Sequence, residues 1–207
     1  MKIHLKTHIM IELMDKAEKY PCEAGVEHIC QEISMLLQLP QKFQSDGKIV
    51  HKRDFLDIIQ WKTPRLLYAK GKNGRKGAEY NSETTIRKVT EEAFSERNLK
   101  RKVEILDDKL HGVGIPVASA ILLFFDPERF AVLDKYAWNA LEHYCLIPIK
   151  KISNWKASDY ETYLTVCKEV SQKLMEYHQL RLPKPLTALR YLDWGLWIKG
   201  KELSEKQ

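Results

Sequence analysis

The chain has 207 residues, of which 30% are charged, and its net charge is +6. This length is enough to bury a hydrophobic core, as one domain or as two small lobes, and the basic balance favours an anionic partner. Charged residues recur throughout the first 20 positions, which argues against a signal peptide or a membrane anchor there. We therefore expect an intracellular, cytoplasmic protein with no membrane partner.

Two scaffold helices are predicted at the start of the chain. Apolar residues recur at spacings of three and four over residues 8–20 and 26–38, as on one face of a helix. Pro21 and Pro40 follow these patterns, and we expect each proline to end its helix, because proline cannot donate the helical hydrogen bond.

The basic charge is concentrated in residues 48–76. This region holds nine Lys or Arg and two acidic residues, whereas the rest of the chain is about neutral. Trp61 lies among these cations, and such a mixture suits a stacked or flipped base, since the ring offers a π face while the cations hold phosphates. Trp61 is thus a candidate for a base pocket, and the alternative is that it is a core residue beside a solvated basic face. The predicted DNA contacts are Lys62, Arg65, Lys72 and Arg75.

A glycine turn between two helices is predicted at residues 110–114. Asn81 or Ser82 begins one helix, and Asn98 begins a second, charged helix that leads to the turn. Gly112 and Gly114 favour a turn with positive φ and leave no side chain in the way of a ligand. The N-H groups and positive dipole end of the next helix would then accept a phosphate oxygen.

A buried helix follows this turn. Residues 116–125, PVASAILLFF, are too apolar for a surface helix and too few to cross a bilayer, so we predict the central helix of the fold here. After a loop with Pro127, Asp134 directly precedes another helical pattern and is predicted to cap it.

Residues 110–138 resemble the helix-hairpin-helix and Gly/Pro-Asp motif of the DNA glycosylase superfamily that includes endonuclease III. The shared features are L-x-G-V-G, a small-residue apolar helix containing Ala118, a loop with proline, and an Asp twenty residues after the second glycine. The resemblance covers about thirty residues, and the flanking chain can be compared only as an all-helical pattern.

The resemblance implies a role for each matching position. Gly112, Val113 and Gly114 would hold a DNA phosphate through backbone amides, with His111 as a solvated contact in the same DNA-binding turn. Asp134 would be the catalytic carboxylate at the sugar of an extruded nucleotide. Besides Trp61, the candidates for the base pocket are Tyr136 and Trp138. No cofactor is expected, and the one metal implied is a monovalent cation on main-chain carbonyls of the hairpin.

Two features of the superfamily are missing. Bifunctional members carry a Schiff-base lysine two residues after the second glycine, where this chain has Pro116. Some relatives carry a four-cysteine iron-sulfur loop, whereas the four cysteines here lack metal-binding spacing and are predicted to be reduced and buried. Lyase activity by the usual route is therefore not expected, and Lys62 is the only lysine that we consider as a substitute amine.

Two further helices complete the expected fold. Ser158 and Glu161 predict a capping box for a helix over residues 159–180, and Thr187 is expected to cap a last helix over residues 188–200. No alternating strand pattern appears. We predict one all-α domain over residues 1–207, with two helical lobes around a central buried helix and the hairpin and Asp motif at residues 102–145.

Three functional hypotheses stay open. The first is a monomeric, monofunctional DNA glycosylase that flips a damaged, mismatched or otherwise modified base out of double-stranded DNA and hydrolyses its N-glycosidic bond. The second is a non-enzymatic DNA-binding hairpin protein in which Asp134 is only a cap. The third is a helical protein whose basic surface binds an acidic protein partner.

Overall fold

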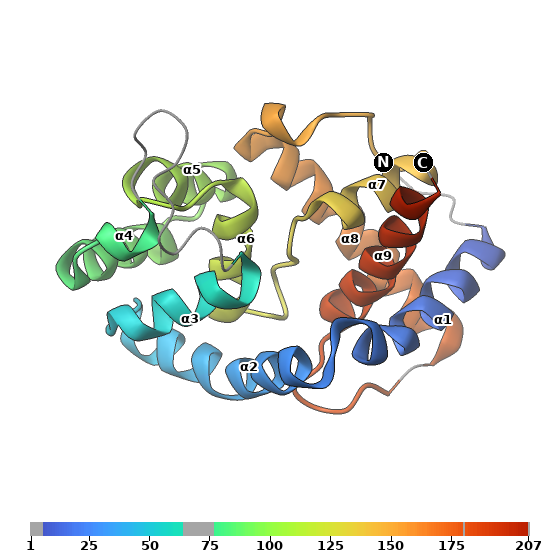
Figure 1. Cartoon of the computed structure of the whole chain (residues 1–207), viewed down its shortest axis with the longest axis horizontal. Helices are drawn as coiled ribbons and strands as arrows, with labels where there is room; N and C mark the ends of the chain where they lie inside the picture. The colour runs from blue at the N-terminus through green and yellow to red at the C-terminus, as the bar shows by residue number, and fades with distance from the viewer. Residues whose placement is uncertain (1–5, 64–76, 180, 207) are drawn as a thin grey trace.

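The computed structural model describes residues 6–63, 77–179 and 181–206. Within these ranges the chain forms helices and connecting segments and no β-strand, which confirms the predicted all-α class (Figure 1). No helix there is long and apolar enough to cross a membrane. Three predicted DNA contacts, Arg65, Lys72 and Arg75, lie outside the described residues.

The first two helices are longer than predicted. α1 (Thr7–Ala24) and α2 (Val26–Asp46) continue through Pro21 and Pro40, so the prediction that these prolines end them is wrong. An internal proline costs a helix about 3 kcal/mol, and buried apolar residues offset this cost, such as Phe43 one turn beyond Pro40. The helices end instead at glycines with positive φ, Gly25 and Gly47.

Of the next elements, α4 (Glu83–Ser95) and α5 (Leu99–Lys109) each begin at a polar side chain that caps the helix. α3 (Lys52–Lys62) follows α2 with its apolar face buried, and the short η2 (Ala78–Tyr80) precedes α4. The hydroxyl of Ser82 accepts a hydrogen bond from the amide of Thr85, and α5 is capped in the same way by Asn98. Of the two residues predicted to begin α4, Ser82 is thus the cap, and the predicted cap Asn98 is confirmed.

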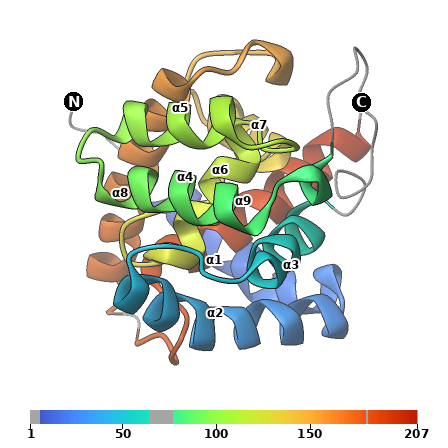
Figure 2. The ribbon, with the colours of Figure 1, turned by 90° about the vertical axis from the view of Figure 1, so that its left-hand side faces the viewer.

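α6 (Ile115–Phe125) is the centre of the molecule, as predicted. Nine of its eleven residues are buried, and it contacts α2, α3, α5 and α8. Figure 1 shows α4 and α5 at one end of the molecule, α1 and α9 at the other, and α6 between them. Figure 2 looks directly onto the end formed by α4 and α5.

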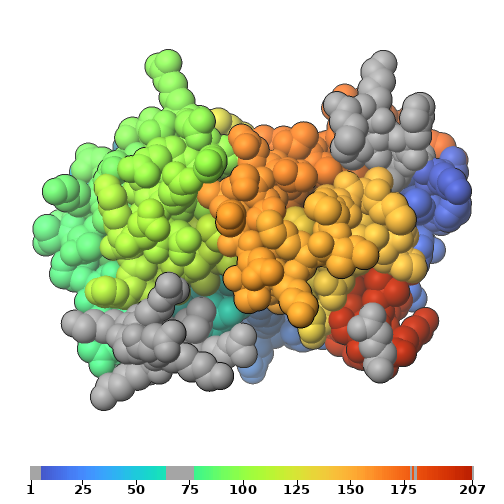
Figure 3. All heavy atoms as spheres, turned by 90° about the horizontal axis from the view of Figure 1, so that it is seen from above, coloured from blue at the N-terminus to red at the C-terminus, as the bar shows by residue number. Residues whose placement is uncertain are grey.

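The last three helices are α7 (Lys135–His143), α8 (Ala157–His178) and α9 (Ala188–Glu205), with η3 (Ile152–Asn154) between the first two. The predicted capping box of Ser158 and Glu161 is wrong, because α8 begins one residue before Ser158. The carboxylate of Asp159 instead accepts from the amide of Lys156 at 2.6 Å. Thr187 caps α9 as predicted. Seen from above, the segment between α7 and α8 lies beside the α5 region (Figure 3).

α9 lies unusually close to two other helices because it carries glycines at the contacts. A Cβ on Gly195 would overlap the carbonyl of Leu13 in α1, and a Cβ on Gly200 would overlap the carbonyl of Tyr136 in α7. The backbones of α1, α7 and α9 therefore pack with no side chain between them at these two points.

All four cysteines are free thiols, but only Cys167 is buried. Cys22, Cys30 and Cys145 are exposed, so the prediction that the cysteines are buried is wrong for three of the four. Cys22 and Cys30 lie on the exposed faces of α1 and α2. The general tendency of free cysteines to be buried therefore does not hold at these two positions.

A glycine turn and a candidate active-site cavity

The turn before α6 is held by one buried side chain. The amide group of Asn81 accepts a hydrogen bond from the backbone N-H of His111 at 2.8 Å, and it donates to the carbonyls of His111 and Ala78, each at 2.8 Å. Gly112 has φ of +72°, and a Cβ there would lie 2.5 Å from the backbone nitrogen of Ala78. Only glycine fits this position.

The second glycine of the turn has a different role from the one predicted. Gly114 has φ of −115°, so the prediction of positive φ is wrong for it. It is the N-terminal cap of α6, and its carbonyl accepts from the amides of Val117 and Ala118 at 2.9 and 2.8 Å. Pro116 is the second residue of α6, where its missing N-H costs no hydrogen bond.

The turn presents backbone rather than side chains. The side chain of Val113 is buried and anchors the turn, whereas His111 is exposed. Within the residues that the structure describes, the amides of Gly112 and Gly114 make no hydrogen bond. Gly114 is the N-cap of α6, where the helix dipole favours negative charge, and Gly112 lies two residues before it.

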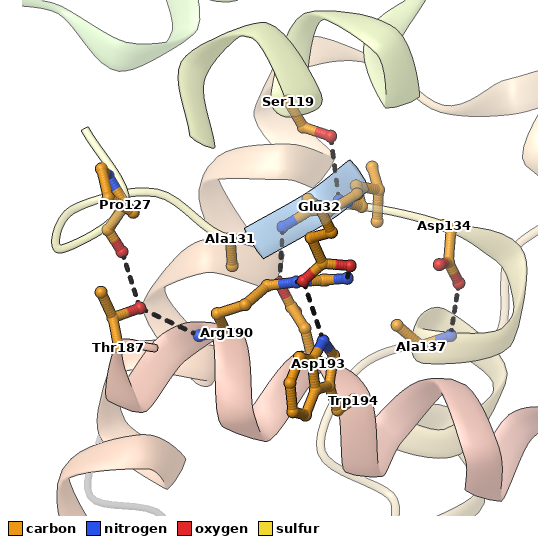
Figure 4. Close-up of polar contacts among 12 residues, drawn as sticks. Glu32, Ser119, Pro127, Ala131, Asp134, Ala137, Thr187, Arg190, Asp193 and Trp194 are labelled. Carbon is orange, nitrogen blue, oxygen red and sulfur yellow. Dashed lines mark hydrogen bonds and ion pairs between the residues drawn. The ribbon is translucent and has the colours of Figure 1, made fainter. Parts of the chain in front are cut away.

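The segment that leads to Asp134 is fixed by hydrogen bonds from buried side chains (Figure 4). The hydroxyl of Tyr163 donates to the carbonyl of Val132 at 3.0 Å, and Asp193 accepts from the amide of Val132 at 2.9 Å. The hydroxyl of Ser119 on α6 accepts from the amide of Leu133 at 2.9 Å and donates to the carbonyl of Pro116 at 2.7 Å. Ser119 thus links this segment to the first turn of α6.

The two carboxylate oxygens of Asp134 have different surroundings. Oδ1 accepts a hydrogen bond from the amide of Ala137 at 2.8 Å, which confirms the predicted N-terminal cap of α7 (Figure 4). Oδ2 lies 3.6 Å from Nζ of Lys62, the last residue of α3. The Asp134 side chain is 23% exposed and that of Lys62 is 9% exposed. Capping therefore uses only one oxygen of this carboxylate.

Asp134 and Lys62 face a cavity of about 280 Å³ between α1, α3 and α9. Its wall combines aromatic rings with side chains of both charges, and small-molecule sites commonly combine aromatic side chains with a few polar or charged groups. The lining residues are Tyr20, Glu23, Ala24, His28, Trp61, Lys62, Val132, Asp134, Arg190 and Trp197.

Trp61 lines the cavity but is only 6% exposed and belongs to the hydrophobic core. The ring of His28 stacks on it with centroids 5.6 Å apart, and the guanidinium of Arg190 lies 5.3 Å from its centroid. The Trp61 ring also packs edge to face against Phe124 of α6, with centroids 5.0 Å apart. Its Nε1 is buried and has no hydrogen-bond partner among the described residues.

The other two aromatic candidates do not line this cavity. Trp138 is 1% exposed, is part of the hydrophobic core and donates through Nε1 to Glu142 at 2.6 Å. Tyr136 packs edge to face against Trp197, with centroids 5.5 Å apart. The predicted base-pocket residues Trp138 and Tyr136 therefore lie outside the cavity that Asp134 faces.

A buried ion network lies behind the cavity. The guanidinium of Arg190 donates to both carboxylate oxygens of Glu32, at 2.7 and 2.8 Å, and Nε1 of Trp194 donates to the same carboxylate at 3.0 Å. Asp193 lies 3.5 Å from Arg190, and burial raises the pKa of its carboxyl to about 6. The network orients Arg190, which lines the cavity, and Asp193, which holds Val132.

Burial also changes the acidity of two cavity groups. Burial lowers the pKa of the Lys62 ammonium below its usual value, and the nearby carboxylate of Asp134 offsets only part of this effect. Burial likewise lowers the pKa of the His28 imidazole. Both changes favour the neutral forms, which are the forms able to accept a proton.

The structure brings together three residues that the sequence suggested, Trp61, Lys62 and Asp134. It adds side chains that sequence analysis did not select, namely Tyr20, His28, Arg190 and Trp197. Only one feature of the sequence could have indicated these residues, namely a charged residue on the otherwise apolar face of a predicted helix. Glu32 and Arg190 each stand among apolar residues that are buried, and a buried charge requires a partner.

Within the described residues, no group of three or more His, Cys, Asp or Glu is arranged to hold a metal ion. No protein-family model, curated protein or solved structure matches the chain. The site is therefore defined by its geometry alone.

Proposed function

We propose that the protein is a DNA glycosylase that hydrolyses the N-glycosidic bond of a damaged, mismatched or otherwise modified base. The observation that carries this proposal is the position of Asp134, whose Oδ2 faces a cavity lined by aromatic and cationic side chains. The protein acts as a monomer on double-stranded DNA inside the cell, and the reaction leaves an abasic site.

The glycine turn serves as a helix-hairpin-helix clamp on the DNA backbone. The amides of Gly112 and Gly114 at the N-terminus of α6 suit a phosphate oxygen. Through Ser119, the first turn of α6 is hydrogen-bonded to the segment that ends at Asp134. A phosphate held at the turn would therefore be kept at a fixed position relative to the carboxylate.

The chemistry assigned to Asp134 is electrostatic stabilisation and proton transfer. Breaking the N-glycosidic bond develops positive charge on the deoxyribose ring, and a fixed carboxylate beside C1′ stabilises that charge. The same carboxylate can orient or deprotonate the attacking water. The water oxygen forms the new bond to C1′, and the base leaves with the bonding electron pair and takes up a proton.

The cavity receives the extruded base. A base inside the duplex stack cannot be reached, so the nucleotide must turn out into a pocket. Trp61 and Trp197 offer aromatic contacts, and Arg190 supplies positive charge.

Replacement of Asp134 by Asn tests this proposal. The amide oxygen of Asn can still cap α7, whereas the negative charge beside the sugar is lost. We expect base release to fall by about 100-fold or more, with DNA affinity changed by less than about threefold. The measurement is mass spectrometry of bases released from a panel of modified duplexes, together with a DNA-binding titration.

Asp159→Asn is the matched control, because Asp159 is also a carboxylate at a helix N-terminus but does not line the cavity. Base release should be unchanged in this variant. If Asp134→Asn keeps full activity and its fold, Asp134 is a cap only. If the wild-type protein binds DNA yet releases no base from any duplex, the non-enzymatic hairpin protein is the better description. An absence of salt-dependent DNA binding would favour the helical partner-binding protein.

A further inference from the structure

α2 carries apolar residues on two of its faces. The inward face is buried in the hydrophobic core, through Met35, Leu36, Leu39 and Phe43. A second stripe, which we call the α2 seam, consists of Val26, Cys30, Ile33 and Leu37. Val26 is 77% exposed and Leu37 is 58% exposed, Cys30 is exposed, and Ile33 is half-buried. The seam is therefore apolar surface that meets solvent.

The seam has the spacing of a stripe through which helices pair. Its residues follow one another at intervals of four, three and four positions, so they lie in one row along the helix. Two helices that carry such rows pack side by side, each side chain fitting between those of the partner. The row extends over about 16 Å of helix. No described part of the chain covers Val26 and Leu37 at its two ends.

The surface around the seam is almost free of charge. Between His28 and Lys42 the only charged residue of α2 is Glu32, which is buried and paired with Arg190. Glu27 lies outside this stretch, in the first turn. The exposed polar residues within it are Ser34, Gln38 and Gln41. In a chain with 30% charged residues this composition is typical of a contact surface, because charged residues are depleted at the centre of protein interfaces.

The lack of charge indicates which partner fits the seam. Nucleic acid is held through Lys and Arg side chains, and the seam has none. A strongly acidic or basic protein is selected by complementary charge, which this face does not offer. Two copies of one chain related by a two-fold axis place the same surface against itself, so any charge there would meet a like charge. A neutral apolar row avoids this repulsion, which a chain of net charge +6 would otherwise meet.

We propose that the α2 seam is the surface through which two copies of this protein associate, with their α2 helices side by side across a two-fold axis. This inference does not rest on the proposed function. None of the four seam residues lines the cavity. α2 runs along the lower side of the molecule in Figures 1 and 2, whereas α5, which leads to the glycine turn, lies in the upper half. Each copy therefore keeps its own turn and cavity and acts singly on one base.

The contact is small, so the association is weak. Three helical turns on each side place it at the low end of interface sizes, below about 1,200 Å² in total. We therefore expect single copies at about 1 μM and dimers at about 100 μM and above. Sedimentation velocity of the full chain over this range measures the dissociation constant.

Charge at the middle of the seam tests the inference. Cys30 and Ile33 are its two middle residues, so each lies near its own counterpart whether the paired helices run parallel or antiparallel. Cys30→Glu brings two like charges together, and we expect the dissociation constant to increase by about tenfold or more. An equal mixture of Cys30→Glu and Cys30→Lys brings opposite charges together and should restore the dimer. Such restoration requires that the same face of both copies takes part.

Ile11→Glu is the matched control, because Ile11 is a 45% exposed apolar residue of α1 outside the seam. Its dissociation constant should equal that of the wild type. Cross-linking of the wild-type protein with a short bis-maleimide gives a readout that does not depend on the folding of any variant. The link between copies should map to Cys30, and Cys145, an exposed thiol between α7 and α8, should not be linked.

Three outcomes would overturn the pairing. The first is a chain that sediments as a single copy over the whole concentration range. The second is a dimer that Cys30→Glu leaves unchanged, because it would use another surface. The third is a chain that stays monomeric alone while a different protein shields Cys30 from alkylation, which would assign the seam to that protein.

Discussion

The glycine turn and the cavity are built in opposite ways. The turn is formed by neighbouring residues, and the one distant side chain that it needs, Asn81, lies 30 positions before His111. The cavity is formed by side chains from α1, α2, α3 and α9 together with the segment at Asp134. Glu32 and Arg190, which support its wall, are 158 positions apart.

This difference predicts how each region responds to change. A substitution in the turn should act locally, on backbone conformation and on the affinity for DNA. A substitution in the ion network behind the cavity should lower the stability of the whole fold. Glu32 and Arg190 are buried charges on different helices, and each leaves the other unpaired when it is replaced. The three predictions below test this contrast.

The largest effect is expected when the buried ion network is broken. Glu32→Met leaves the guanidinium of Arg190 without its two-oxygen partner and leaves Nε1 of Trp194 without an acceptor. Loss of one partner of a buried pair costs about 3–5 kcal/mol, which should appear as a lower free energy of unfolding in urea. Glu91→Met removes an exposed pair with Lys48 and should cost less than about 1 kcal/mol. Equal losses in the two variants would contradict the contrast.

A smaller effect is expected at Gly112. Gly112→Ala places a Cβ in the left-handed region and within 2.5 Å of the backbone of Ala78. The combined strain and overlap should cost about 2–4 kcal/mol, measured as a lower midpoint of urea unfolding. At Gly114→Ala the new Cβ meets no atom closer than 3.9 Å, so little strain is expected. If the two variants were equally stable, Gly112 would not need its positive φ.

The smallest effect is expected at the cap of α6, where stability and DNA affinity should separate. Gly114→Asp puts a favourable cap residue at a helix N-terminus, so the free energy of unfolding should be unchanged or slightly higher. The added negative charge repels a phosphate held at the turn, and we expect the Kd for DNA to increase by about tenfold at low salt. An unchanged Kd would show that the turn does not hold the DNA backbone.

Sequence analysis predicted the features that depend on neighbouring residues. The capping roles of Ser82, Asn98, Asp134 and Thr187, and the burial of α6, follow from local patterns and are confirmed. Pro21 and Pro40 were misinterpreted because packing of the helix faces outweighs the local cost of a proline. The start of α8 was misplaced because the carboxylate of Asp159, not the hydroxyl of Ser158, completes its first turn.

The cavity could be predicted only in part. Trp61, Lys62 and Asp134 were selected because charge and spacing mark them in the sequence. Tyr20 and Trp197 meet across the contact between α1 and α9, and no local pattern pairs two helices so far apart in the chain. Trp138 and Tyr136 were candidates as aromatic residues, and residue type does not give the direction of a side chain on a helix.

The glycines of α9 have a consequence for ligand recognition. Because Gly195 and Gly200 bring α9 against α1 and α7 without intervening side chains, we expect the aromatic wall at these helices to move little when a ligand binds. A preorganised wall loses little conformational entropy on association. Under the proposed function, selection among nucleobases should then depend on shape complementarity with a fixed wall rather than on its rearrangement.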